Sequence, residues 1–169
     1  MINEKLVSLG PARSDLNYWN FETVDIAPYL LQGANTIAAV VWNEGEYRPE
    51  GQISNRTGFL LQGNTAKEEI INTNSSWKSL KNSAYTPLTG ICYNAYYVAG
   101  PGELVDMHVM PHGWMKNNFD DNAWPNAVKI GWRGATPNGA VDIADWMLVP
   151  SPLPQMELTP QRFVAVRKA

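Results

Sequence analysis

Three tryptophans lie in polar loops, where their surroundings suit them to bind sugar. Trp19 follows an Asn-Tyr pair and precedes an asparagine, Trp114 follows a His-Gly pair, and Trp132 precedes an arginine. An indole stacks on the apolar C–H face of a pyranose, while amides, carboxylates and guanidinium groups pair with the sugar hydroxyls. The candidate carbohydrate-binding residues are therefore Asn17, Trp19, Trp114, Trp132, Arg133 and Asp142. The competing interpretation is that these rings pack against a neighbouring domain.

The acidic residues are scattered over turns, and their spacing does not single out a catalytic pair. A glycosidase needs two carboxylates that flank a cleft, and the distance between them depends on whether the enzyme retains or inverts the configuration of the sugar. We therefore predict no catalytic residue in this chain, and we keep open the alternative of an enzyme with an unrecognised carboxylate pair. No cofactor is required, although the Asp and Asn oxygens of the loops could ligate Ca²⁺.

The lone cysteine and the two histidines offer weaker chemistry. Cys92 has no flanking signature of a nucleophile and reads as a small buried hydrophobe. His108 and His112 are four residues apart, but Pro111 argues against the helix that would direct both rings to one metal. Hydrogen-bonded or surface histidines are the stronger interpretation.

Composition excludes two classes of partner. The 169 residues contain 13 Lys and Arg against 16 Asp and Glu, so the net charge of −3 provides no basic excess for nucleic acid. The longest apolar stretches, such as 36–42, fall far short of the ~20 residues of a membrane helix. The chain is long enough for one domain with its own core.

The pattern of short segments predicts an all-β fold. Thirteen glycines and 12 prolines punctuate the chain, and the stretches between them are rich in β-branched and aromatic residues. Thr36–Trp42 is the clearest strand, and because both of its faces are apolar we expect it to be covered on both sides. Further strands are expected at Gly58–Leu61, Glu69–Asn72, Ile91–Val98 and Leu104–Val109.

Turns and the chain ends complete the predicted organisation. Asp25–Leu31 reads as a turn or a single helical turn, and Phe119–Pro125 as a tight turn capped by an aspartate. Residues 1–149 are expected to form an antiparallel sandwich that lacks its first strand, since Ile2–Leu9 resembles half of a hairpin. Residues 150–169, where prolines alternate, are expected to be a stiff connector toward a missing domain.

Several motifs resemble the β-sandwich accessory domains of glycoside hydrolases. Asp25–Gly45 is similar to their strand–turn–strand pattern, and Ile2–Pro11 to the segment before it, with Glu4 where these domains usually place glycine. Asn72–Trp77 and Phe119–Trp124 resemble their two polar turns that end in tryptophan. The segment Trp146–Glu157 is similar to the exit of the N-terminal region in bacterial α-L-rhamnosidases of glycoside hydrolase family 78.

This resemblance implies a galactose-binding-domain-like jelly roll that precedes an α/α toroidal catalytic domain. In that family two glutamates of the toroid act as general acid and base in an inverting reaction, and nothing in this chain corresponds to the toroid. The expected parent is a periplasmic or secreted bacterial enzyme. Some members carry an N-terminal module that binds L-rhamnose with Ca²⁺.

The expected function follows from the resemblance and the loop tryptophans together. It is to bind carbohydrate, such as an L-rhamnose-containing glycan, or to brace the active-site rim of the neighbouring catalytic domain. A third interpretation is that the chain is a purely structural fragment.

Overall fold

The computed structural model describes residues 1–15, 18–52, 56–91, 100–130, 136–137, 147–165 and 167–168. Regular structure in these residues consists of short strands and 3₁₀ turns without an α-helix, which is compatible with the expected all-β class. The strands are β1 (Tyr18–Phe21), β2 (Tyr85–Pro87), β3 (Glu103–Val105), β4 (Thr136–Pro137) and β5 (Met147–Pro150). The 3₁₀ turns are η1 (Ala27–Tyr29), η2 (Gly45–Tyr47), η3 (Ala66–Ile71) and η4 (Thr89–Ile91). Within the described part of the chain, no helix has the length and apolar character to cross a membrane.

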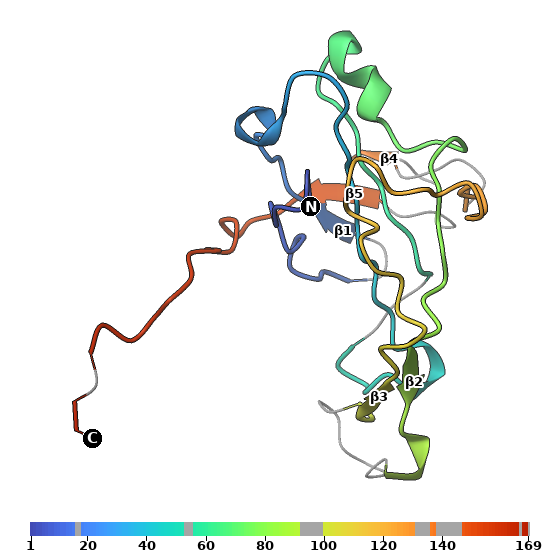
Figure 1. The fold of residues 1–169 in the computed structure, drawn as a ribbon, viewed down its shortest axis with the longest axis vertical. Helices are drawn as coiled ribbons and strands as arrows, with labels where there is room; N and C mark the ends of the chain where they lie inside the picture. Colours follow the sequence, from blue (N-terminus) through green and yellow to red (C-terminus); the bar gives the residue numbers. More distant parts are fainter. Residues whose placement is uncertain are drawn as a thin grey trace.

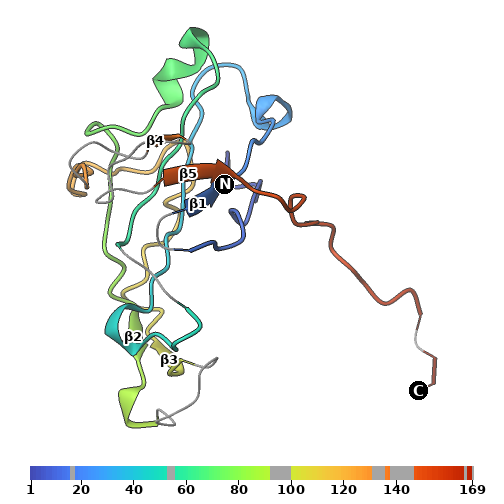
Figure 2. The same ribbon diagram turned by 180° about the vertical axis from the view of Figure 1, so that it is seen from behind.

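Two small sheets organise the molecule. In the first, β5 lies between β1 and β4 and is parallel to both, with Trp19 opposite Leu148. In the second, β2 and β3 are antiparallel, and this sheet lies at one end of the elongated body, with η3 at the other (Figures 1 and 2). The expected antiparallel arrangement is confirmed for β2–β3 and is wrong for the three-stranded sheet. There β1 meets a strand from the far end of the sequence, so a long connection replaces the hairpin that antiparallel neighbours use.

A tight turn fixes the N-terminal segment. Ile2 and Lys5 exchange both backbone hydrogen bonds at 2.9 Å, and the two residues between them, Asn3 and Glu4, have φ of 48° and 66°. Positive φ at both central positions is the pattern of a type I′ hairpin turn. This turn brings Ile2 opposite Ile37, and Ile2 is one of three buried apolar residues in the described chain.

The Asn3 side chain ties this turn to two other segments of the chain. Its Nδ2 donates to the Tyr29 carbonyl at 2.9 Å and to Asn35 Oδ1 at 2.8 Å. Its Oδ1 accepts from the Thr36 amide at 3.0 Å. The side chain therefore joins the N-terminal turn, η1 and the start of the 36–42 segment.

The strand expected at Thr36–Trp42 is not formed, and the expectation that both faces are covered is wrong. Only Ile37 of this segment forms a β-bridge, while Val40 is 72% and Trp42 61% exposed. An apolar pattern shows that a segment needs cover, but a strand also needs a neighbouring backbone edge along its length. The described residues provide such an edge only at the beginning of this segment.

A capping interaction replaces the strand expected at Glu69–Asn72. Glu68 Oε2 accepts from the amides of Asn64 and Thr65 at 2.7 and 3.1 Å, so η3 begins directly after Thr65. Such a carboxylate accepts hydrogen bonds from amides that have no partner at the start of a helix, and it therefore favours the helical turn over an extended strand. No strand forms at Gly58–Leu61, although the Thr73 amide donates to the Leu61 carbonyl at 3.0 Å.

The remaining predicted elements had mixed outcomes. Most of the strand expected at Ile91–Val98 lies outside the described residues. Only Leu104 and Val105 of the Leu104–Val109 segment belong to a strand, because Asp106 Oδ1 accepts from the His108 amide and starts a turn. The single helical turn within Asp25–Leu31 is confirmed as η1, with Pro28 in its first positions.

The turn expected at Phe119–Pro125 is also confirmed. Asp120 Oδ1 accepts from the Asn122 amide at 3.1 Å, and the Trp124 amide donates to the Asp121 carbonyl at 2.9 Å. The rings of Phe119 and Trp124 meet edge to face, with centroids 5.4 Å apart. Here the local sequence contains both the cap and the aromatic contact that hold the turn.

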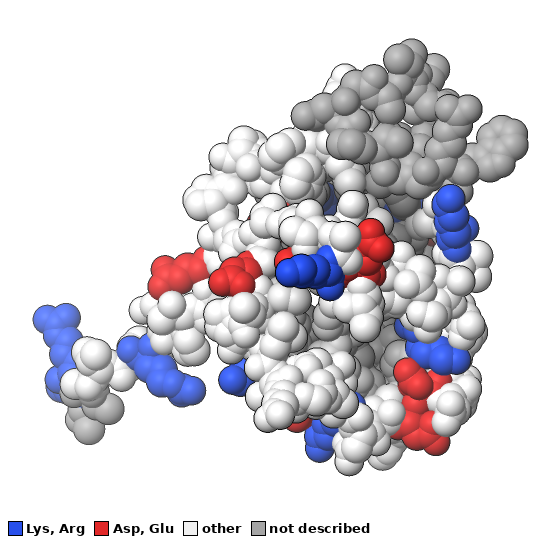
Figure 3. Space-filling model, turned by 90° about the horizontal axis from the view of Figure 1, so that it is seen from above, with Lys and Arg blue, Asp and Glu red and all other residues white. Residues whose placement is uncertain are grey.

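The chain leaves much apolar surface uncovered. Its accessible surface is 13,639 Å², whereas a compact monomer of this mass exposes about 8,300 Å². Among the described residues, 24 large apolar side chains are more than a third exposed, and the buried apolar residues are Ile2, Pro49 and Ala84. Part of the excess comes from the segment after β5, which runs away from the body (Figures 1 and 2). Figure 3 shows acidic and basic side chains interspersed on the visible face of the body, with basic ones on this outlying segment.

Candidate functional site

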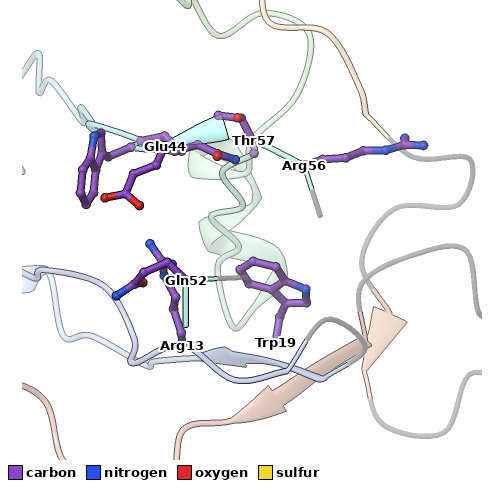
Figure 4. Close-up of a pocket in the computed structure, with 10 residues that line it drawn as sticks. Arg13, Trp19, Glu44, Gln52, Arg56 and Thr57 are labelled. Carbon is purple, nitrogen blue, oxygen red and sulfur yellow. The ribbon is translucent and has the colours of Figure 1, made fainter. Parts of the chain in front are cut away.

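A cavity of about 130 Å³ opens beside β1 and is the candidate site. It combines two indoles with charged and amide side chains, from three separate stretches of the sequence. The lining residues are Arg13, Trp19, Val41, Trp42, Asn43, Glu44, Gln52, Arg56, Thr57 and Gly58. Figure 4 shows Glu44 and Thr57 on one side of the cavity, opposite Arg13, Gln52 and Trp19.

Strand β1 and the loop before it position Trp19 and Arg13. Pairing with β5 fixes the backbone of Trp19, whose side chain is half-buried. Asp15 Oδ1 accepts from the Tyr18 amide at 2.9 Å and holds the start of the strand. Asn20 Nδ2 donates to the Ala12 carbonyl at 2.9 Å, which keeps the loop that carries Arg13 beside β1.

Glu44 is held at the start of η2. The Tyr47 amide donates to the Glu44 carbonyl at 3.2 Å, and Asn43 Oδ1 accepts from the Gly45 amide at 2.8 Å. The Glu44 carboxylate packs against Gly100, where an added Cβ would lie 3.1 Å from Oε1. Its Oε2 is shielded from solvent and has no hydrogen-bond partner among the residues that the structure describes.

The polar groups around this carboxylate differ in their direction. Figure 4 shows the Glu44 carboxylate directed into the space between the two walls, with Arg13 and Gln52 reaching toward it from the opposite wall. Arg56 extends away from that space (Figure 4). The cavity therefore presents one carboxylate, one guanidinium group and an amide to a ligand, beside the indole of Trp19.

The donor set of the cavity does not fit calcium. Ca²⁺ takes six to eight oxygen ligands and favours several carboxylates. The cavity is lined by a single carboxylate, that of Glu44, and by two arginines, whose positive charges oppose cation binding. Throughout the described ranges, no three His, Cys, Asp or Glu side chains gather as a metal site would require. His112 Nε2 lies 3.1 Å from the Met107 carbonyl, as expected for a hydrogen-bonded histidine.

Of the residues predicted to bind sugar, the structure places Trp19 in the cavity and Trp114 outside its lining. Trp114 is half-buried in the turn after Gly113, whose φ is 73°. The other four predicted residues, Asn17, Trp132, Arg133 and Asp142, lie outside the described part of the chain, as does Cys92.

Sequence reasoning missed the partners of Trp19 in the cavity. The apolar pattern of Thr36–Trp42 predicts a covered strand for Trp42, and Glu44 is one of the acidic residues scattered over turns. The available signal was the proximity of Trp42 and Glu44 in the sequence, since Trp42-Asn43-Glu44 places an indole, an amide and a carboxylate on consecutive residues. Arg13 and Gln52 carry no comparable local signal.

Comparison with known protein families gives a match. The family model described as the alpha-L-rhamnosidase N-terminal domain matches residues 5–167, which is nearly the whole chain. No curated protein and no solved structure matches. The match agrees with the motifs at Asp25–Gly45 and Trp146–Glu157, and the chain therefore belongs to the alpha-L-rhamnosidase N-terminal domain family.

Proposed function

We propose that the chain is a non-catalytic domain of a rhamnosidase-like glycoside hydrolase and that it binds carbohydrate in the cavity beside Trp19. The observation that carries this proposal is the composition of the cavity: two indoles, a carboxylate, guanidinium groups and amides line the same space. Family membership supplies the context, since the parent expected from it, an inverting α-L-rhamnosidase, acts on sugars.

Each chemical group of the cavity has a counterpart on a sugar ring. The indole of Trp19 offers an apolar face to the C–H side of a pyranose. The Glu44 carboxylate accepts hydrogen bonds from hydroxyls, and Arg13 and Gln52 donate to hydroxyl or ring oxygens. Because these groups come from different segments held by their own backbone bonds, little ordering is needed when the ligand binds.

The cavity supports binding rather than hydrolysis. Glycoside hydrolysis uses two carboxylates that flank the scissile bond, and the lining contains one, Glu44. We therefore expect the isolated chain to leave an aryl rhamnoside intact. Hydrolysis at a rate above that of a heat-denatured sample would instead support the alternative of a self-contained enzyme.

Titration calorimetry of the chain with L-rhamnose, D-galactose and D-glucose tests the binding proposal. We expect saturable binding of at least one of these sugars, weakened roughly tenfold in Trp19→Ala through loss of the stacking face. Trp114→Ala is the matched control, because it removes a half-buried indole that does not line the cavity. Absence of heat at millimolar sugar, or equal weakening in both variants, would contradict the proposal.

A second candidate function, bracing the rest of the parent protein, is favoured by the uncovered apolar surface. The described residues expose 24 large apolar side chains, which a neighbouring domain would cover. Trp42, Val40 and Phe59 are among the exposed apolar residues. Hydrogen exchange tests this role: amides of segments 39–42 and 58–60 should be protected in the whole parent protein and exchange rapidly in this chain alone. Equal exchange in both would refute it.

A further inference from the structure

We propose that the turn of residues 107–112 binds a soft monovalent metal ion, Cu(I), through the thioether of Met107 and the imidazoles of His108 and His112. This inference is independent of carbohydrate binding, because none of these residues lines the cavity beside Trp19. It assigns a role to two histidines that the carbohydrate site does not use.

Histidine and methionine are concentrated in one short segment of the chain. Residues 107–115 contain both histidines of the protein and three of its six methionines. Thioether sulfur is a soft ligand that favours Cu(I), whereas Ca²⁺ and Mg²⁺ prefer oxygen, and imidazole suits both copper and zinc. Copper is therefore the metal that the two residue types have in common.

A hydrogen bond prepares His112 to bind a metal. Its Nε2 lies 3.1 Å from the Met107 carbonyl oxygen. Because a carbonyl can only accept, the neutral ring donates from Nε2 and keeps its lone pair on Nδ1. Histidines that bind a metal through one nitrogen commonly donate from the other to a carbonyl or a carboxylate, which fixes the tautomer and the ring orientation. The structure therefore presents Nδ1 of His112 as the ligand atom.

The same hydrogen bond closes the turn and brings the three ligand residues together. At its start, Asp106 Oδ1 accepts from the His108 amide at 2.9 Å, and the Asp106 amide donates to the carbonyl of the buried Ala84 at 2.9 Å. Both histidines are exposed, and Met107 is 56% exposed. The three rotatable bonds of Met107 allow its sulfur to turn toward the His112 ring. Metal binding then needs side-chain rotation on a backbone that is already held.

The ligand set favours Cu(I) over zinc. Structural zinc sites use four ligands from Cys, His, Asp and Glu, and no three side chains of these types gather in the ranges that the structure describes. A site built on the two histidines must therefore be completed by methionine, which Cu(I) accepts. Met110 is already engaged, since its sulfur accepts from Asn82 Nδ2 at 3.2 Å. Met107 is the thioether that the turn leaves for the metal.

The test titrates the whole chain with Cu(I) under anaerobic conditions, in competition with a chromophoric Cu(I) chelator. We expect the affinity to fall roughly tenfold or more in Met107→Leu, which keeps the side-chain volume but removes the sulfur, and in His112→Gln, which keeps an N–H donor but removes the imidazole. Met156→Leu is the matched control, because Met156 is 57% exposed, like Met107, and lies in the segment after β5. Zn(II) should bind more weakly than Cu(I).

Nitrogen NMR of the histidine rings tests the assigned ligand atom. Ag(I), which has the same charge and preference for soft ligands but does not undergo redox reactions here, is the probe. We expect the Nδ1 resonance of His112 to shift when Ag(I) is added, while Nε2 keeps its proton.

Four results would overturn the inference. These are absence of Cu(I) binding in competition with the chelator, equal Cu(I) affinities of Met107→Leu and Met156→Leu, tighter binding of Zn(II) than of Cu(I), and a metal-induced shift at Nε2 of His112 in place of Nδ1. Each of these results leaves the proposed carbohydrate binding untouched, because no sugar is present in the titrations.

Discussion

Replacing Glu4 with glycine should stabilise the chain, because Glu4 occupies a backbone conformation that suits glycine. Its φ is 66°, in a turn where Asn3 also has positive φ. The left-handed region costs an L-residue about 1–2 kcal/mol, and glycine avoids this cost. Glycine also has greater conformational freedom in the unfolded chain, which opposes the gain by about 0.5–1 kcal/mol. The expected net stabilisation by Glu4→Gly is about 0.5–1 kcal/mol.

Thermal unfolding followed by circular dichroism measures this effect. For a chain of this size, the expected stabilisation corresponds to a rise in Tm of roughly 1–4 °C. Glu4→Ala separates the backbone effect from the loss of charge, because alanine removes the exposed carboxylate but retains the Cβ that clashes at positive φ. An equal rise in Tm for both variants would refute the reasoning, as would a lower Tm for Glu4→Gly.

Two further predictions concern turns that the structure defines. Asn3→Gly should lower stability by about 1–3 kcal/mol, because it removes bonds to the Tyr29 carbonyl, Asn35 Oδ1 and the Thr36 amide; urea unfolding measures this, and a gain like that of Glu4→Gly would contradict it. Gly63→Ala should destabilise the turn before η3 by about 1–3 kcal/mol, because the added Cβ would lie 2.7 Å from the Glu68 carbonyl oxygen. Hydrogen exchange of the Asn64 and Thr65 amides reports on this turn, and unchanged rates would contradict the predicted clash.

The sequence predicts local turns well because their stabilising groups are local. Pro28 marks the position of η1, and Asp120 caps the turn that ends at Trp124. The capping pair of Thr65 and Glu68 is equally local, but the β-branched residues that follow it favour a strand by their type. In that segment the satisfied amides outweigh the intrinsic preference for an extended chain.

Pairings between distant segments could not be predicted in the same way. Nothing near Trp19 in the sequence indicates that β1 lies parallel to β5, or that Glu44 and Gln52 line the same cavity. The apolar pattern of Thr36–Trp42 indicated burial, but it contains no information on which surface provides that burial. Trp19 was identified because its polar neighbours are adjacent in sequence, whereas its partners in the cavity come together only through the fold.

The parallel pairing of β1 with β5 also constrains the order of events when the chain is made. By the loop-closure relation, joining strands about 125 residues apart costs about 2 kcal/mol more than joining β2 to β3 across about 15. At the usual rate of translation, roughly 2–9 s separate the synthesis of Val105 from that of Pro150. Throughout that interval the β2–β3 hairpin can close on the ribosome, while β1 still lacks its partner strand β5. The nascent chain thus carries its first strand unpaired until synthesis of the fold is almost complete.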